Sequence, residues 1–291
     1  MKPDAFAAVM ATGIVSIAAA DHGYRLVSSV LACVAAILLA LLVVWALARL
    51  RPSFEDVNVP LQLFTFVAAC AVVATRLEFS STTHTLLGIA AALAWLSLVP
   101  LTVRLMWRHR WAGLRDRARG AWELASVATS GLAIVAADAG HPWPAVALLA
   151  LAICQYCAMT GLVLWRALHS RSAPELRQPD VWILMGGAAI ATLAGDHIDK
   201  AGLGAIKPVT VVTWVVASAW IPLLAAWSVR LRSGNWWAAV FPLGMYSSAT
   251  FATSVEMGWP ALAVISAVFC WIALAAWLLA ISARLRALSA V

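Results

Sequence analysis

The stretch Trp236-Trp237-Ala238-Ala239-Val240-Phe241-Pro242-Leu243-Gly244-Met245-Tyr246 places a proline two residues before a glycine inside an apolar segment. Proline removes a backbone donor, so the pattern predicts an interruption of the helix at Pro242. Hydrocarbon cannot satisfy the freed backbone groups, and such a site is tolerated only against protein or a water-filled cavity. Phe241, directly before the proline, is therefore a candidate constriction in a pathway through a membrane.

The composition predicts an integral membrane protein. Of the 291 residues, 64% are hydrophobic and only 11% are charged, and the mean hydropathy is +0.90. Because roughly 20 apolar residues cross a bilayer, we expect an all-α polytopic membrane protein forming one transmembrane domain over residues 1–291. The expected spans are residues 5–20, 26–47, 61–75, 85–106, 121–137, 145–168, 181–194, 209–229, 236–255 and 260–285.

Basic residues fall unevenly between the two sets of loops. Of the 20 Lys and Arg residues, 16 lie on the side that carries both termini, and the exceptions are Arg25, Arg76, Lys200 and Lys207. The positive-inside rule predicts that both termini are cytoplasmic, in a protein of the cell membrane. The net charge of +7 is thus an insertion signal, and the scattered Arg residues do not favour nucleic acid as a partner.

A repeat covers the chain. The odd-numbered segments follow Pro3, Pro60, Gly120, Pro179 and Asn235, at intervals of 57, 60, 59 and 56 residues. Each unit is predicted to be a helical hairpin. Its first helix is richer in small and hydroxyl residues, and its second helix is more hydrophobic. Small and polar residues prefer protein or water to lipid, so the fold class predicted is ten transmembrane helices in five hairpins, with the odd helices as an inner ring around a central pore.

The candidate pore gate is Phe241. The candidate pore-lining or helix-distorting residues are Thr12, Gly13, Ser16, Phe66, Ser126, Thr129, Ser130, Gly186, Gly187, Pro242, Gly244 and Ser248. For each small residue, close packing between helices is an open alternative. Phe66 lies six residues after Pro60, as Phe241 does after Asn235, so Phe66 is either a second ring-facing aromatic or a packing residue.

The expected membrane interior holds no charged or His residue near the middle of a helix, which favours passive conduction over a coupled pump. Glu123 and Asp138 lie at the ends of the fifth segment, where interfacial hydration or the helix dipole accounts for them. The inner helices would all present their N-termini to the cytoplasm, which modestly favours anions.

Other chemistry has little support. Cys154 and Cys157 lie in an apolar helix as packing residues, and Asp196, His197 and Asp199 read as a solvated loop more readily than as a metal site. No nucleotide loop, zinc motif or catalytic pair is visible. We therefore expect no cofactor, no metal and no enzymatic activity.

Three motifs resemble one family. Residues Pro3-Asp4-Ala5-Phe6-Ala7-Ala8-Val9-Met10-Ala11-Thr12-Gly13-Ile14-Val15-Ser16, the stretch Thr192-Leu193-Ala194-Gly195, and Trp236-Trp237 followed by Phe241-Pro242-Leu243-Gly244 are similar to the tellurite-resistance and dicarboxylate transporter family. That family includes the slow anion channels of plant guard cells.

The resemblance implies five hairpins around a pore plugged by Phe241, and commonly a homotrimer with one pore in each subunit. It also implies small anions as partners: chloride, nitrate, malate-like dicarboxylates, and sulfite or tellurite-related anions. Little sequence lies outside the first and last segments, so we expect no gating through long tails. Two functions stay open, an anion channel or a proton- or ion-coupled C4-dicarboxylate secondary carrier.

Overall fold

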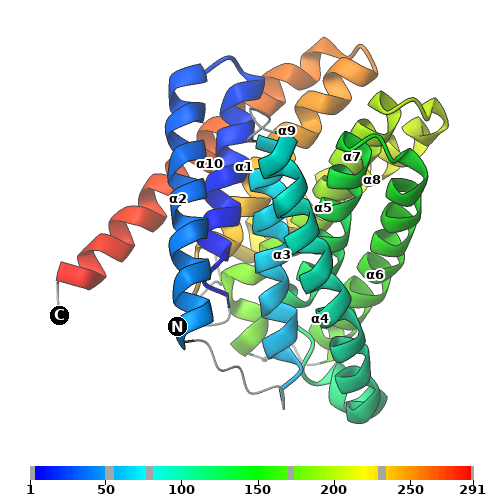
Figure 1. Cartoon of the computed structure of the whole chain (residues 1–291). Coiled ribbons are helices and arrows are strands. Elements are labelled where there is room, and N and C mark those ends of the chain that lie inside the picture. Colours follow the sequence, from blue (N-terminus) through cyan, green and yellow to red (C-terminus); the bar gives the residue numbers. More distant parts are fainter. Residues whose placement is uncertain (1–3, 50–55, 77–80, 170–173, 229–233, 290–291) are drawn as a thin grey trace.

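The computed structural model describes residues 4–49, 56–76, 81–169, 174–228 and 234–289 (Figure 1). Within these ranges the chain forms ten α-helices, four short 3-10 turns and no strand. The α-helices are α1 (Ala7–Asp21), α2 (Arg25–Arg49), α3 (Asn58–Arg76), α4 (Ser81–Arg115), α5 (Leu124–Asp138), α6 (Pro142–His169), α7 (Ile183–Lys200), α8 (Lys207–Ser228), α9 (Trp237–Glu256) and α10 (Pro260–Ser289). Pro3 and Val229, expected at the edges of two spans, lie outside the described residues.

The 3-10 turns lead into later helices. Turn η1 (Gly120–Glu123) precedes α5, η2 (Pro174–Arg177) and η3 (Pro179–Trp182) precede α7, and η4 (Gly204–Ile206) precedes α8. The prediction of an all-helical membrane protein is confirmed. Among the described residues, eight helical stretches are long and apolar enough to cross a membrane. The exceptions are α1, apolar but only 15 residues long, and α9, whose Ser and Thr residues lower its hydropathy.

The helices pack as pairs around a ring. Each odd-numbered helix has its most extensive contact with the even-numbered helix that follows it. The odd helices also contact one another in the order α1, α3, α5, α7 and α9, and α9 returns to α1. Within their apolar windows, 94% of the η1–α5 stretch is buried but only 17% of the η4–α8 stretch. The ring is therefore the core, and the even helices cover it (Figure 1).

One glycine lies at each contact of the ring. A Cβ built on any of the five would come within about 3.2 Å of a neighbouring side chain, closer than ordinary van der Waals contact. The pairs, around the ring from α1, are Gly13 with Val72, Gly131 with Ala71, Gly187 with Ser126, Gly186 with Pro242, and Gly244 with Ile14. Missing side chains thus let the five helices approach closely.

Among the described residues, α1, α5, α7 and α9 end in tight turns. Gly23, Gly140, Gly202 and Gly258 have φ between 67° and 101°, a region that glycine enters without a Cβ clash. Each follows an odd helix and precedes its partner, so these turns close four of the helix pairs.

The expected interruption at Pro242 is wrong, because α9 is continuous from Trp237 to Glu256. Only one acceptor loses its partner, since the missing N–H of Pro242 would have bonded the carbonyl of Ala238, four residues earlier. Ala238 lines a cavity, where water can replace that donor.

Gly13→Ala tests the close packing of the ring. Its Cβ would lie 2.6 Å from Cγ1 of Val72, and such overpacking costs about 1–3 kcal/mol. We expect a lower midpoint of thermal unfolding in detergent. Gly161→Ala, on α6 where no atom lies within 4 Å of the new Cβ, is the matched control and should not lower the midpoint. Equal midpoints for the two variants would contradict the packing argument.

Candidate functional site

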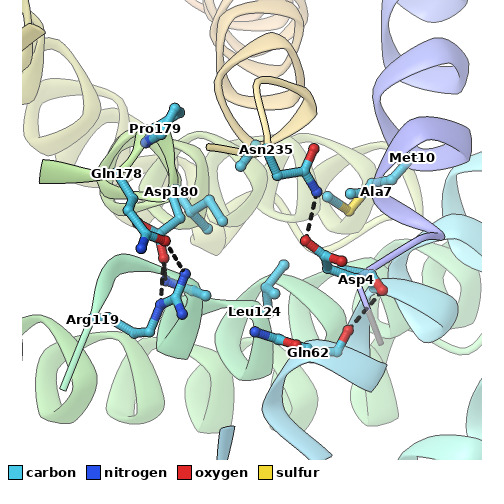
Figure 2. A pocket seen from close by; sticks show the side chains of 14 residues that line it. Asp4, Ala7, Met10, Gln62, Arg119, Leu124, Gln178, Pro179, Asp180 and Asn235 are labelled. Carbon is cyan, nitrogen blue, oxygen red and sulfur yellow. Dashed lines mark hydrogen bonds and ion pairs between the residues drawn. The ribbon is translucent and has the colours of Figure 1, made fainter. Parts of the chain in front are cut away.

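A cavity opens where the five odd helices begin. We call it the N-terminal cavity, and each odd helix or the turn leading into it contributes lining residues. They include Asp4, Gln62, Arg119, Asp180 and Asn235 (Figure 2). Its open space is about 30 Å³, enough for one or two water molecules but too small for a dicarboxylate.

Polar contacts join neighbouring helices around this cavity. Nε of Arg119 lies 2.7 Å from Oδ2 of Asp180, and its Nη2 donates to Oε1 of Gln178 over 2.7 Å. These contacts connect the segment before α5 to the segment before α7. Across the cavity, Nδ2 of Asn235 donates to Oδ2 of Asp4 over 2.7 Å, which connects the starts of α9 and α1 (Figure 2).

Two further contacts join α3 to its neighbours in the ring. Nε1 of Trp122 donates to Oδ1 of Asn58 over 2.9 Å, which links η1 to α3. Phe66 of α3 packs edge-on against Phe6, just before α1, with ring centroids 5.1 Å apart. Of the two interpretations of Phe66, this contact supports the packing one.

Asp180 is the most buried charge at the cavity, and its side chain is 7% exposed. Its Oδ2 also accepts from the backbone N–H of Ala121 over 3.2 Å, so the carboxylate caps the turn that starts α5. Its Oδ1 has no hydrogen-bond partner among the described residues. Arg119 and the helix N-termini supply the positive field that holds this carboxylate.

Phe241 lies one turn deeper than the cavity. It is fully buried, three residues beyond Ala238 on α9. Gly186 of α7 faces this turn, because a Cβ built there would lie 3.1 Å from Cγ of Pro242 and 3.5 Å from Cε1 of Phe241. On the far side of Phe241, Gly244 packs against Ile14 of α1.

Several candidate hydroxyls bond outward, to the even helices. Trp277 of α10 donates to Oγ1 of Thr12 over 2.9 Å, and Trp95 of α4 donates to Oγ1 of Thr129 over 2.8 Å. Ser16 and Ser28 of α2 each donate to the other's carbonyl over 2.7 Å. These hydrogen bonds fix the outer helices to the ring.

Other candidate hydroxyls stay within the ring. Ser126 donates to the carboxylate of Glu123 over 2.8 Å. Ser130 of α5 is 1% exposed, and its Oγ has no hydrogen-bond partner among the described residues. Ser248 of α9 is 2% exposed, and its Oγ also has no hydrogen-bond partner among the described residues. An unpaired buried hydroxyl is uncommon and marks a place for water or a ligand.

The opposite end of the ring is charged. The solvated loop expected at Asp196, His197 and Asp199 is wrong, because these residues lie in the last turns of α7 and Asp196 is 3% exposed. Each of them pairs with a different group. His197 lies 2.6 Å from Asp138 of α5, Lys200 lies 2.6 Å from Asp196, and Lys207 lies 3.6 Å from Asp199.

His22 lies in the turn between α1 and α2. Its Nε2 is 2.8 Å from Oγ of Ser266 on α10. Partial burial lowers the pKa of His22 below its usual value, while the contact with Ser266 opposes this. Because Oγ of Ser266 already donates to the carbonyl of Ser247 over 2.7 Å, Nε2 of His22 is the donor in this contact.

Three site residues were not singled out from the sequence as functional. Arg119 was counted only among the basic loop residues, and Asp180 was not singled out. Of the two explanations for Glu123, interfacial hydration is wrong, because the residue is fully buried, and stabilisation by the helix dipole stays open. Asp180 and Glu123 both lie in the first turn of an odd-numbered segment, where acidic residues interact with exposed N–H groups. Their position in the first helical turn was the feature of the sequence that could have identified Asp180 and Glu123 as site residues.

Arg119→Ala tests the ion pair at the cavity. It leaves the carboxylate of Asp180 buried without a cation, which costs about 3 kcal/mol or more. We expect a clear loss of thermal stability in detergent, most of it recovered in Arg119→Ala with Asp180→Asn. Arg115→Ala, which removes an exposed pair with Asp116, is the control and should cause no resolved change. Equal losses in the two single variants would count against the cavity pair.

Comparison with known proteins agrees with this architecture. An uncharacterized membrane protein of Mycobacterium tuberculosis (strain CDC 1551 / Oshkosh), MT1776, is 32% identical over 152 residues, covering 46% of this chain and 77% of the relative. Rv1735c of strain ATCC 25618 / H37Rv matches with the same identity and coverage.

The family model SLAC1, voltage-dependent anion channel, matches residues 1–285. Members of this family are channels or transporters rather than enzymes. The resemblance seen in the sequence motifs is thereby confirmed. Because the match spans nearly the whole chain, this protein belongs to the SLAC1 family of voltage-dependent anion channels.

Proposed function

We propose that the chain is a passive anion channel whose pore runs along the axis of the inner ring and is occluded by Phe241. The observation that carries this proposal is the position of Phe241, fully buried one turn beyond a cavity to which all five odd helices contribute. The unpaired hydroxyl of Ser130 supports a polar path beyond the phenyl ring. Gly186 has no side chain, so α7 approaches the Phe241–Pro242 turn closely.

The wider arrangement follows from the same ring. We propose that all ten helices span the membrane as five hairpins in one transmembrane domain. Helix α1 is short and α9 is rich in Ser and Thr, but neither helix needs a long apolar surface, because both are surrounded by protein rather than lipid. The basic loops favour cytoplasmic termini in a cell membrane, so the N-terminal cavity would face the cytoplasm. The homotrimer implied by the resemblance is proposed on that ground alone.

The proposed substrates are small anions: chloride and nitrate first, then malate-like dicarboxylates and sulfite or tellurite-related anions. The N-terminal cavity contains Arg119 and the N-termini of the inner helices, which attract anions. The alternative, a proton- or ion-coupled C4-dicarboxylate carrier, is favoured by one observation, the buried carboxylate of Glu123.

Phe241→Ala tests the occlusion. Removing the phenyl ring opens the path, so we expect chloride and nitrate flux in liposomes to rise about tenfold or more, corresponding to a barrier lower by about 1.4 kcal/mol. Phe269→Ala, on the outer helix α10 beside Tyr246, is the aromatic control and should conduct like the unmutated protein. Flux through Phe241→Ala no higher than through that control would exclude Phe241 as the plug.

The order of anions tests passive conduction. The guanidinium of Arg119 is already bonded to Asp180 and Gln178, and the proposed path beyond it offers no bidentate clamp. Selectivity should therefore follow the cost of removing water from each ion. We expect nitrate flux to exceed chloride flux, and both to exceed sulfite and malate flux, in Phe241→Ala liposomes without a proton or sodium gradient. Malate uptake that disappears when the gradient is collapsed would instead indicate a coupled carrier.

A further inference from the structure

Glu123 is a carboxylate enclosed by neutral partners. It lies in η1 at the start of α5 and is 0% exposed. The hydroxyl of Thr160 on α6 donates to Oε1 over 2.5 Å, and the hydroxyl of Ser126 donates to Oε2 over 2.8 Å. No ion pair to Glu123 occurs among the described residues. Burying an ionised carboxylate without a cation is costly, so this packing fits the neutral, proton-bearing group.

The groups around Glu123 confirm the lack of a compensating charge. Helix α6, which packs against η1, carries Tyr156 and Cys157 in this region, and neither side chain is a cation. The hydroxyl of Tyr156 accepts from Nε1 of Trp220 over 2.7 Å. Further along α6, Arg166 donates to the carbonyl of Ala118 over 2.8 Å.

The other elements packed against η1 also bring no free cation. Asp180 of η3 is paired with Arg119. The charged side chains of α3 and α7 lie at their far ends, beginning at Arg76 and Asp196 respectively, and α5 ends in Asp138. The only other titratable group of α3 is the buried thiol of Cys70.

A short series of contacts joins Glu123 to Phe241. Ser126, which bonds Glu123, lies against Gly187 of α7, where a Cβ would come within 3.2 Å of its Oγ. The same Cβ would lie 2.9 Å from the ring of Tyr156. The adjacent Gly186 lies against Pro242 and Phe241 on α9. Two consecutive glycines of α7 therefore separate the carboxyl cluster from the constriction.

We propose that Glu123 is a proton-binding site that controls the Phe241 constriction through Gly186 and Gly187. With the proton bound, Oε2 of Glu123 donates to Oγ of Ser126, whose own hydrogen reaches the carbonyl of Glu123 over 2.9 Å, and α7 holds Phe241 buried. Loss of the proton creates a buried charge that must draw in water, which rearranges Ser126 and Tyr156 and releases α7. The ligand is a proton, and the site rests on the proposed function of Phe241 as the plug.

The first experiment measures chloride flux in liposomes from about pH 5 to about pH 9. We expect the flux of the unmutated protein to rise about fivefold or more with pH, a coupling typical of linked sites. Glu123→Gln keeps the shape of the side chain without the titration, so its flux should stay low and independent of pH. Asp116→Asn, which removes an exposed carboxylate, is the control and should keep the pH dependence of the unmutated protein.

Two further variants test whether Glu123 acts on the flux through Phe241. Phe241→Ala should conduct strongly at every pH, because the constriction that the proton controls is gone. Glu123→Asp keeps an acid with altered hydrogen bonds, so its flux should still depend on pH with a shifted midpoint. That variant decides the question if Glu123→Gln does not fold, as judged by size-exclusion profile and thermal midpoint. An unshifted midpoint would then overturn the proposal.

An independent readout separates this proposal from the proposed function. Difference infrared spectroscopy between high and low pH should show a neutral carboxyl band that is absent in Glu123→Gln, whether or not anions flow. Glu123→Gln with an unchanged pH profile, or no such band, would overturn the proton site. A band together with no anion flux through any variant would overturn the channel and, with it, the control of Phe241 by Glu123.

Discussion

Close approach of the five inner helices is the constraint on which the rest of the structure depends. It is achieved by one glycine at each contact of the ring, from Gly13 against Val72 to Gly244 against Ile14. Lipid offers no hydrophobic drive for helices to associate, so van der Waals contact and hydrogen bonding must hold the ring together. Close contact leaves little space on the axis, and a single phenyl ring can then close it.

The outer helices stabilise this ring through repeated hydrogen bonds. Indole N–H groups of α4, α8 and α10 each reach a threonine of an inner helix, namely Thr129, Thr250 and Thr12. Each hydrogen bond satisfies a polar group between two packed helices, and it holds a hydrophobic outer helix against an inner helix rich in small residues. A hydroxyl on an inner helix can therefore either line a pore or bind an outer helix, and its hydrogen-bond partner shows which of the two it does.

Charge at depth changes the functional interpretation. The inner ring is neutral over most of its length, as passive conduction requires, but Glu123 is enclosed at its start and Asp180 is held by Arg119 at the cavity. The glycine pair of α7 has one neighbour in each region, Ser126 on one side and Pro242 on the other. A small motion of α7 would thus change the packing around both Ser126 and Pro242. A channel and a proton-responsive protein are compatible within this one architecture.

The sequence by itself determined the membrane setting, the helical class, the family and the position of Phe241 beside a proline, because hydropathy, spacing and local motifs are written along the chain. The continuity of α9 through Pro242 was visible only in the tertiary structure, where Ala238, whose carbonyl has no N–H of residue 242 to accept from, lines the N-terminal cavity. The partners of Thr12, Ser16 and Thr129, the burial of Glu123, and the pairing of Arg119 with Asp180 were decided there too. Each depends on which residues, dozens of positions apart, face each other once the ring closes, and a one-dimensional pattern contains no such distance.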